Sequence, residues 1–209
     1  MVEKDAATVS RQQQVGAMAR QETRRRLLIA AGEEFEAGGY QAATVSRIAE
    51  RAGVTVQTLY LAWGNKRSLL RAYLESRLSG GGQGPDAVVK RFVGKSPREV
   101  VDELAALVGE IADRAAIGWK LYRDASVVDP EIAADWDELQ SLRRRTIDKA
   151  LRNIPTGALR AGMARRDAVD TAWAIVSPEC YELLVTRRGY TLDQFQNWMR
   201  QTLRAALLR

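Results

Sequence analysis

The sequence predicts an all-α fold, with a three-helix helix-turn-helix unit near the N-terminus and a larger helical bundle after it. Apolar residues recur at spacings of three and four residues along most of the chain, which is the period of an α-helix. Only 5 of the 209 residues are proline, and short breaks rich in glycine or proline separate the periodic stretches. A chain of this length buries about 70% of its unfolded surface, so it needs no disulfide to fold.

Composition narrows the chemistry that is available to the chain. Histidine is absent and Cys180 is the only cysteine, which excludes an internal disulfide, structural zinc and the Ser-His-Asp and Cys-His arrangements of hydrolases. We therefore expect no metal, no cofactor and no enzymatic activity. The alternative is a helical enzyme that uses Asp170, Glu179 or Glu182 as a base, although no carboxylates are paired at a catalytic spacing. The formal charge of +6 fits nucleic acid, a membrane surface or an acidic protein as partner.

The N-terminal residues carry no targeting signal. No apolar run approaches the roughly 18 residues of a membrane span, and the polar first twenty residues lack the apolar core of a signal peptide. The sequence therefore predicts a cytoplasmic protein without a membrane partner. Residues 1–19 are expected to form a flexible arm, which either enters a minor groove or is a plain tail.

The first expected helix runs from about Gln21 to Ala37. Leu27, Ala31 and Phe35 recur every four residues along it, and Gly38-Gly39 ends it. Basic residues cluster at its beginning, either as phosphate contacts or as a solvated charge run. These residues are Arg20, Arg24, Arg25 and Arg26.

Residues 44–66 predict two short helices hinged at Gly53. Ile48, Ala49 and Ala52 give the first of these helices an apolar face. Gly53 supplies the left-handed conformation of a tight turn, and the small side chain of Ala49 lets the helices cross closely. This arrangement is a helix-turn-helix.

The outward face of the second short helix carries hydroxyl, amide and methyl groups instead of the usual Lys and Glu. Such groups hydrogen-bond base edges or phosphate oxygens, or touch a thymine methyl. Lys66 at the start of the next helix is unfavourable for the helix dipole and therefore has another use, which we take to be a phosphate contact. The segment predicts DNA binding through Thr55, Val56, Gln57, Thr58 and Tyr60.

A longer pattern of motifs extends from Thr23 to Leu70. It runs through Arg26-Leu27-Leu28, Phe35, Gly38-Gly39-Tyr40, Thr44-Val45, Ile48-Ala49, Ala52-Gly53-Val54, Thr58-Leu59-Tyr60 and Lys66. Over this range the chain resembles the DNA-binding domain of the TetR family of transcriptional regulators. One departure is Leu61-Ala62-Trp63, where members commonly carry an aromatic or histidine pair. Trp63 replaces the core phenylalanine of the family, whereas Ala62 removes a side chain that often reaches phosphate.

The resemblance implies a DNA-binding domain over residues 20–68 and an effector-binding and dimerisation domain over residues 69–209. It implies a homodimer that binds double-stranded DNA, with the third helix in the major groove, and releases it when a small molecule occupies the second domain. Carried over position by position, base and phosphate contacts fall on Thr44, Ser46, Arg47, Thr55, Val56, Gln57, Thr58, Tyr60 and Lys66.

The remaining chain predicts longer helices after residues 80–85, which are expected to form a flexible joint or a surface loop. Ser96-Pro97-Arg98-Glu99 forms a capping box with proline at the first helical position, and Asp129-Pro130-Glu131 repeats the start signal. The first stripe contains Val101, Leu104, Val108, Ile111 and Ala115, and the second contains Ile132, Trp136, Leu139 and Ile147. Residues 119–123 are expected to form a short connecting helix, and residues 153–157 end the second stripe.

The last two helices have a heptad-like rhythm, and the second of them starts at a capping box formed by Thr191 and Gln194. Pairing of this hairpin with its symmetry mate would form a four-helix bundle. The alternative is that the seam packs inside its own subunit. The interface residues expected from the seam are Val169, Trp173, Val176, Cys180, Leu183, Phe195, Met199, Thr202 and Ala206.

Large aromatic residues of the second domain are candidates for the wall of an apolar ligand pocket. Each of them is alternatively an ordinary core residue. Pro178, inside a helical pattern, is expected to start a kinked segment that shapes a cavity wall. The predicted pocket residues are Trp119, Tyr122, Arg123, Trp136, Trp173 and Tyr181, and they favour an apolar or aromatic ligand.

These observations favour a transcriptional repressor that binds a palindromic operator as a homodimer and responds to a ligand, because two recognition helices reach successive major grooves. The alternative is an architectural or activator DNA-binding protein without an effector.

Overall fold

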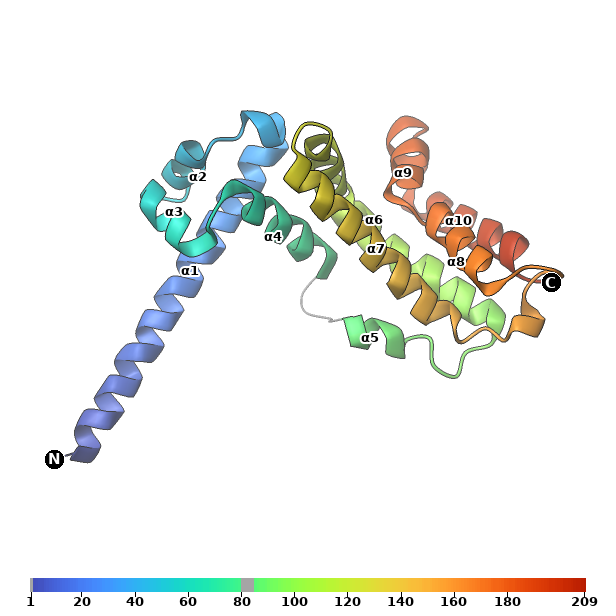
Figure 1. Cartoon of the computed structure of the whole chain (residues 1–209), viewed down its shortest axis with the longest axis horizontal. Helices are drawn as coiled ribbons and strands as arrows, with labels where there is room; N and C mark the ends of the chain where they lie inside the picture. Colours follow the sequence, from blue (N-terminus) through green and yellow to red (C-terminus); the bar gives the residue numbers. More distant parts are fainter. Residues whose placement is uncertain (1, 80–84) are drawn as a thin grey trace. The chain divides into compact units, whose positions relative to one another are not determined.

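The computed structural model describes residues 2–79 and 85–209, and the side chains of residues 13–79 and 88–209 (Figure 1). The chain divides into two compact units, Met1–Leu74 and Glu75–Arg209. Residues 80–84 of the predicted joint lie outside the described residues. All regular elements of the described residues are helical, as the periodicity predicts.

The N-terminal unit contains α1 (Val2–Ala42), α2 (Val45–Arg51), α3 (Val56–Trp63) and the start of α4 (Lys66–Ser79). Helix α1 begins well before the predicted Gln21, because residues 12–19 are rich in helix-forming glutamine, alanine and methionine and contain no proline. The predicted break is at Gly39, whose φ of 77° and ψ of 172° are not helical.

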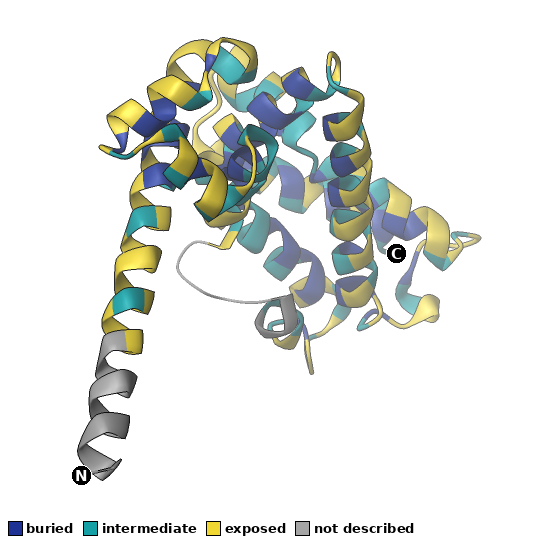
Figure 2. Cartoon of the chain, turned by 60° about the vertical axis from the view of Figure 1, so that its left-hand side comes forward, coloured by how far each residue is buried: buried dark blue, intermediate teal, exposed yellow. Residues whose placement is uncertain are grey.

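Among the described side chains of α1, which start at residue 13, the first buried one is Leu27. In Figure 2 the described early turns of this helix are exposed or half-buried, and its later turns carry buried residues. Leu27, Ala31 and Phe35 are fully buried there, as the four-residue spacing predicts, and Ile48 and Leu59 bring α2 and α3 onto them. This packing fixes which face of α3 points outward.

The turn between α2 and α3 has the conformation that its sequence predicts. Gly53 has a φ of 65°, which is in the left-handed region. The amide of Val54 donates to the carbonyl of Ala49 at 3.0 Å and closes the turn. The side chain of Thr55 then starts α3 by accepting a hydrogen bond from the amide of Thr58.

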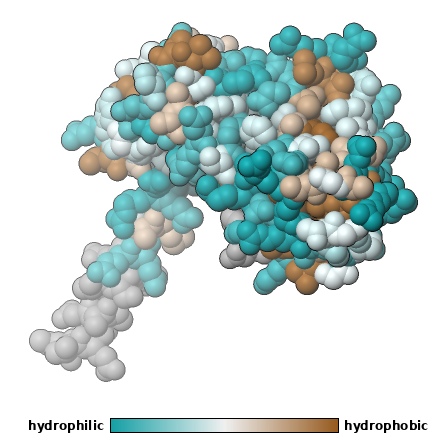
Figure 3. Space-filling view, turned by 45° about the vertical axis from the view of Figure 1, so that its right-hand side comes forward, coloured by the Kyte–Doolittle hydropathy of each residue, from teal (hydrophilic) through white to brown (hydrophobic). Residues whose placement is uncertain are grey.

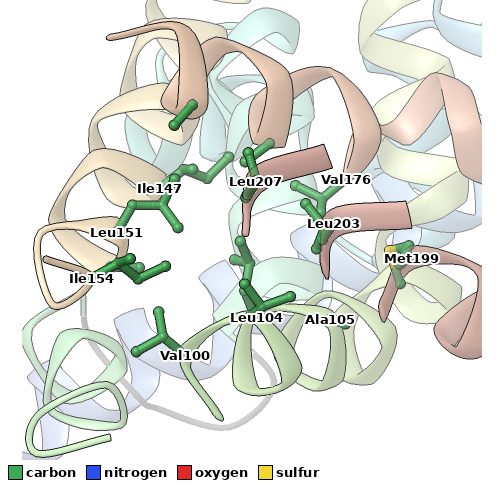
Figure 4. Packing of buried hydrophobic residues seen from close by; sticks show 14 of the residues in the cluster. Val100, Leu104, Ala105, Ile147, Leu151, Ile154, Val176, Met199, Leu203 and Leu207 are labelled. Atoms are coloured by element: carbon green, nitrogen blue, oxygen red, sulfur yellow. The ribbon is translucent and has the colours of Figure 1, made fainter. Parts of the chain in front are cut away.

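The C-terminal unit is a bundle of long helices with shorter segments between them. Its elements after α4 are α5 (Pro85–Lys90), α6 (Pro97–Ser126), α7 (Pro130–Leu151), the 3-10 turn η1 (Thr156–Ala158), α8 (Arg165–Ile175), α9 (Pro178–Tyr181), the π-helical segment η2 (Glu182–Arg187) and α10 (Leu192–Leu207). Figure 4 shows the core, in which side chains of α6, α7 and α10 point toward one another. Leu104, Leu151 and Leu203 are among its buried residues.

The predicted helix starts of this unit are confirmed. Ser96 and Glu99 form a capping box with Pro97 in the first turn, and Thr191 and Gln194 form another. The carboxylate of Asp129 accepts hydrogen bonds from the amides of Glu131 and Ile132 at the start of α7. Each cap satisfies backbone donors that the first turn of a helix leaves without partners.

Two predictions about continuity are wrong. Residues 119–123 form no separate helix, because Trp119 and Tyr122 keep the apolar face of α6 and a single glycine, Gly118, does not break the helix before them. The first of the two helices predicted for the C-terminal seam is not continuous either. Helix α8 ends at Ile175, and Ser177 caps a new start with Pro178 in its first turn. Proline lacks the amide hydrogen and crowds the carbonyl four residues before it, so the kink expected there becomes a break.

No helix within residues 2–79 and 85–209 combines the length and the hydropathy that crossing a bilayer requires.

Candidate DNA interface and ligand cavity

Helix α3 is capped at its start and packs one face against the N-terminal unit. At its start, the hydroxyl of Thr55 accepts from the amide of Thr58 at 3.1 Å and lies 2.9 Å from the hydroxyl of Thr58. Leu59 is fully buried and anchors the inner face. Thr55 therefore belongs to the N-cap of α3, a role that the sequence did not assign to it.

The exposed side chains of α3 are those with hydrogen-bonding or methyl groups. Gln57 is exposed, and Tyr60 exposes 49% of its surface. Val56 and Thr58 are half-buried beside them. Leu61, which the sequence analysis did not select, is 83% exposed. Its signal was an apolar residue next to Tyr60 and two positions beyond the buried Leu59, on the outward side of a helix.

The predicted contacts of α2 lie around a buried carboxylate. Thr44 caps α2 by accepting from the amide of Arg47 at 3.2 Å, and Ser46 is exposed. The guanidinium of Arg47 pairs with Glu34 of α1 at 2.9 Å, and that of Arg51 pairs with the same carboxylate at 2.8 Å. Glu34 is only 3% exposed, so these pairs brace α2 against α1. The Arg47 side chain still exposes 57% of its surface.

Lys66 has intramolecular partners at the start of α4. Its ammonium group donates to the carbonyls of Tyr40 and Ala43 at 2.8 Å each, and it lies 4.2 Å from the centre of the Tyr40 ring. These bonds tie the segment after the Gly39 kink to α4. They explain a lysine at a position that the helix dipole disfavours. Its contact with phosphate stays a prediction.

Arg24 and Trp63 form a second connection between α1 and the end of α3. The guanidinium of Arg24 lies 3.8 Å from the centre of the Trp63 ring and donates to the carbonyl of Ala62. The indole nitrogen of Trp63 donates to the carbonyl of Arg24 at 3.3 Å. Arg25 pairs with Glu22 at 2.8 Å, while Arg20 and Arg26 are exposed. The arginine cluster therefore remains at the surface, but two of its members are positioned by neighbours.

The C-terminal unit contains a cavity of about 850 Å³ between α4, α6, α7 and α9. Its wall is mostly apolar, and a volume of this size suits a drug-sized ligand. Trp119 and Tyr181 line it, as the sequence predicts. The hydroxyl of Tyr181 donates to Asp113 at 3.0 Å, and burial together with this bond raises the pKa of Tyr181 to about 12.

The other four residues predicted for the pocket do not line the cavity. Tyr122 is fully buried and donates to Asp135 at 2.9 Å. Arg123 pairs with Glu182, and Trp136 packs edge-on against Trp119 with ring centres 5.7 Å apart. Trp173 lies beneath the guanidinium of Arg143. The sequence identified these large side chains but did not reveal which side of each helix faces the cavity.

Arg143 is a charged residue of the cavity wall that the sequence did not indicate. Its Nη1 donates to the carbonyl of Trp173 at 2.9 Å, and its Nε donates to the side-chain oxygen of Gln140 at 3.1 Å. Burial lowers its pKa to about 10. In the sequence it stands in a run of three arginines, which is typical of a solvated face. Its signal was the spacing, because it lies midway between Leu139 and Ile147 on the apolar stripe of α7.

Arg114 reaches from α6 to the end of α4. Its Nε donates to the carbonyl of Arg77 at 2.8 Å, and its Nη2 donates to that of Leu78 at 3.3 Å. These carbonyls belong to the last turn of α4, where a cation is favourable. Arg114 and the last two turns of α4 both line the cavity.

The predicted interface residues divide into two groups. Val169, Val176, Phe195 and Met199 are at most 4% exposed and belong to the core of their own unit, which is the alternative that the sequence left open for the seam. Leu183 is 53% exposed. Figure 3 shows apolar side chains between hydrophilic ones on one face of the molecule. The half-buried members of the second group are Trp173, Cys180, Thr202 and Ala206.

Comparison with known protein families identifies the N-terminal unit. The family model described as bacterial regulatory proteins, tetR family, matches residues 27–73. A relative from Bacillus subtilis (strain 168), the uncharacterized HTH-type transcriptional regulator YdeS, is 28% identical over 166 residues. The alignment covers 78% of this chain and 79% of YdeS.

Solved structures share the fold over most of the chain. NalD, the secondary repressor of the MexAB-OprM multidrug efflux pump in Pseudomonas aeruginosa, matches with a TM-score of 0.70 and 18% identity, over 90% of this chain and 97% of NalD. SmeT in its complex with triclosan matches with a TM-score of 0.71 and 20% identity, over 90% of this chain and 92% of SmeT. At these identities the likeness shows a shared fold.

Proposed function

Because the chain is a DNA-binding transcriptional regulator of the TetR family, we propose that it represses transcription by binding a palindromic operator as a homodimer, and that a small apolar or aromatic ligand releases it. The observation that carries the proposal is the outward face of α3. It exposes Gln57 and Tyr60 in a segment that the family model matches. In this proposal the protein binds its ligand without converting it chemically.

The reading of bases is assigned to α3, with Val56, Gln57 and Tyr60 at base edges or thymine methyls. Contact with phosphate is assigned to Thr44, Ser46 and Arg47 of α2 and to Thr58 and Lys66. Thr44 and Thr55 act partly as helix caps, so their hydroxyls also set the position of the neighbouring backbone amides. Leu61 joins this surface through its exposed side chain.

Dimerisation is assigned to the exposed and half-buried faces of α8, η2 and α10, and it sets the form of the operator. Two recognition helices related by a twofold axis reach successive major grooves about 34 to 36 Å apart. We assign DNA binding to residues 20–68 and effector binding and dimerisation to residues 69–209. The expected operator is therefore a palindrome.

Effector control is assigned to the cavity of the C-terminal unit. The similar structure of SmeT was solved with triclosan, and the similar NalD is described as a repressor of a drug efflux pump. Helix α4 starts at Lys66 and ends beside the cavity, where Glu75, Leu78 and Ser79 line the wall. A ligand that displaces this end of α4 acts on the helix whose beginning carries Lys66. It shifts the equilibrium only if it favours one position of the helix over the other.

Selection of genomic fragments by the purified protein tests the regulator proposal. We expect enrichment of a palindromic site, and binding that weakens steeply with salt because phosphate contacts release counterions. Equal affinity for selected and random fragments in a mobility-shift series would reject operator recognition. A selected site that no cavity ligand releases would instead favour the architectural or activator alternative.

A further inference from the structure

The cavity of the C-terminal unit has a mostly apolar wall, and its charged lining residues are the carboxylates Glu75 and Glu110 and the arginines Arg91, Arg114 and Arg143. Both Nη atoms of Arg91 donate to the Glu110 carboxylate at 2.8 Å, and Arg91 also pairs with Glu103. Among the residues whose side chains are described, neither Arg114 nor Arg143 forms an ion pair with a carboxylate.

The two arginines differ in how far neutral groups satisfy them. All three nitrogens of Arg114 have acceptors, because Nη1 donates to the carbonyl of Glu110 at 2.6 Å in addition to the two bonds at the end of α4. In Arg143, Nε and Nη1 have acceptors. The Nη2 atom of Arg143 is buried and has no acceptor among the described residues.

Burial of an arginine without an anionic partner is costly. A buried charge without a carboxylate, or a buried donor without an acceptor, loses hydration that nothing replaces. The low pKa of Arg143 reflects this loss, and Glu179 opposes it only through space, without a hydrogen bond. The guanidinium of Arg143 also lies 4.7 Å from the centre of the Trp173 ring, and Arg143 lines the cavity.

We propose that the ligand of this cavity is an apolar molecule that carries one anionic group, such as a carboxylate or a sulfonate, and that this group binds the guanidinium of Arg143. The inference rests on the proposed effector function and names the chemical class of the effector. An anion in the cavity gives this guanidinium a partner of opposite charge and forms a charge-assisted hydrogen bond with it. A neutral ligand of the same shape fills the cavity but leaves the charge of Arg143 unbalanced.

Two fluorescent probes with the same aromatic skeleton test this inference. 8-Anilinonaphthalene-1-sulfonate carries an anionic group, and N-phenyl-1-naphthylamine lacks it. Both are titrated into the full-length protein, with emission as the readout of binding. We expect one saturable site per chain and an affinity for the sulfonate that is higher by about tenfold or more, the usual effect of a hydrogen bond to a charged group.

Substitutions then locate the anion. Arg143→Met is expected to abolish the preference for the sulfonate while the affinity for the neutral amine changes by less than about twofold. Arg143→Lys, which keeps the charge but not the planar fork, retains part of the preference and serves if the methionine variant does not fold. Arg114→Met is the matched control, because this arginine also lines the cavity, and it is expected to keep the preference.

The possible failures are distinguishable. Equal affinity of the two probes, or a preference that survives in Arg143→Met, overturns the inference but leaves the cavity as a ligand site. If the preference for the sulfonate disappears only in Arg114→Met, the anion binds Arg114 instead of Arg143, and the inference is also overturned. If neither probe binds at a saturable site, effector control through this cavity fails together with the inference.

Discussion

A single buried carboxylate organises much of the charge on the N-terminal unit. Glu34 forms ion pairs with Arg47 and Arg51, both from α2, and its own side chain is almost fully buried. Removing a partner from such a buried group leaves its remaining charge without compensation. Arg47 therefore holds α2 in place and still exposes more than half of its side chain. One side chain can thus support the fold and also lie at the proposed DNA surface.

Gln57 is the residue whose substitution separates base reading from folding. We expect Gln57→Ala to relax the preference at one operator position by about 1 to 3 kcal/mol and to leave the melting temperature unchanged, because Gln57 is exposed. Lys66→Met is the comparison. It is expected to weaken binding to all sequences alike and also to lower the melting temperature, because two carbonyls lose their donor. Mobility shifts on single-base operator variants measure the first effect. An unchanged base preference in Gln57→Ala contradicts the assignment.

Gly32 marks a close approach of α1 to α4 within the N-terminal unit. A Cβ at this position would lie 2.8 Å from the ring of Tyr73, which is buried and whose hydroxyl donates to Glu36. Gly32→Ala is therefore expected to destabilise the protein by about 1 to 3 kcal/mol, measured by urea unfolding. Gly16→Ala is the control, since its Cβ would meet only the flexible end of Arg20, and it should stabilise the helix slightly. A stabilised Gly32→Ala variant would show that this packing is wrong.

The tertiary contacts of single side chains were harder to predict from the sequence than the residues that cap helices. The start at Ser96 depends on residues within three positions of it, so the sequence displays the whole interaction. The partners of Lys66 lie 23 and 26 residues away in the sequence. Arg143 is held by the carbonyl of Trp173, which is 30 residues away in α8. Such contacts are set by tertiary packing, which local spacing does not encode.

At the scale of elements, periodicity predicted helices better than their ends. The apolar stripe through Val169 and Val176 continues in the sequence across the place where α8 stops, because both residues are buried in the same core. Only Pro178 signals the break. The π-helical turns of η2 have no such signal, because they widen a helix without any breaking residue. Similarly, α6 continues past Gly118, since one glycine costs a helix only about 1 kcal/mol.

The segment after α5 is tied to α6 by a charge cluster that responds to acid. The hydrogen bond from Arg91 holds the pKa of Glu110 below its ordinary value of 4.5. A carboxylate of this kind adds stability above pH 4.5, and this contribution disappears as the pH falls through its lower folded pKa. We therefore expect the unfolding free energy to fall as the pH decreases below 4.5.

The contribution of this cluster is expected to stay below about 1 kcal/mol, because Glu110 is half exposed. Arg91→Met should reduce the slope of the unfolding free energy in this acid range. Arg98→Met, which removes an exposed arginine at the start of α6, is the control and should leave the slope unchanged. Identical slopes in the wild type and Arg91→Met would contradict the role of the cluster.

At the scale of the whole molecule, the bundle uses one side of α8 and α10 for its own core, and we assign the other side to the proposed dimer interface. Leu183 is the most exposed of the residues assigned to the dimer. Leu183→Glu places a charge there and is expected to weaken self-association by about tenfold or more. Analytical ultracentrifugation measures the association.

Loss of the dimer should also reduce operator affinity, because a monomer reaches only one half-site. Val93→Glu is the control, since Val93 is 68% exposed and lies outside the assigned interface. If Leu183→Glu sediments like the wild type while Val93→Glu dissociates, the interface lies elsewhere on the C-terminal unit.

The stacking of Arg24 on Trp63 also affects the thermodynamics of association with DNA. An arginine that becomes ordered only on binding loses about 1.5 to 2 kcal/mol of rotamer entropy. Here the indole face and the carbonyl of Ala62 already hold the guanidinium, so folding has removed most of that freedom. The positive charge is therefore preorganised at the end of α3, and we expect a phosphate contact by Arg24 to lose little further rotamer entropy.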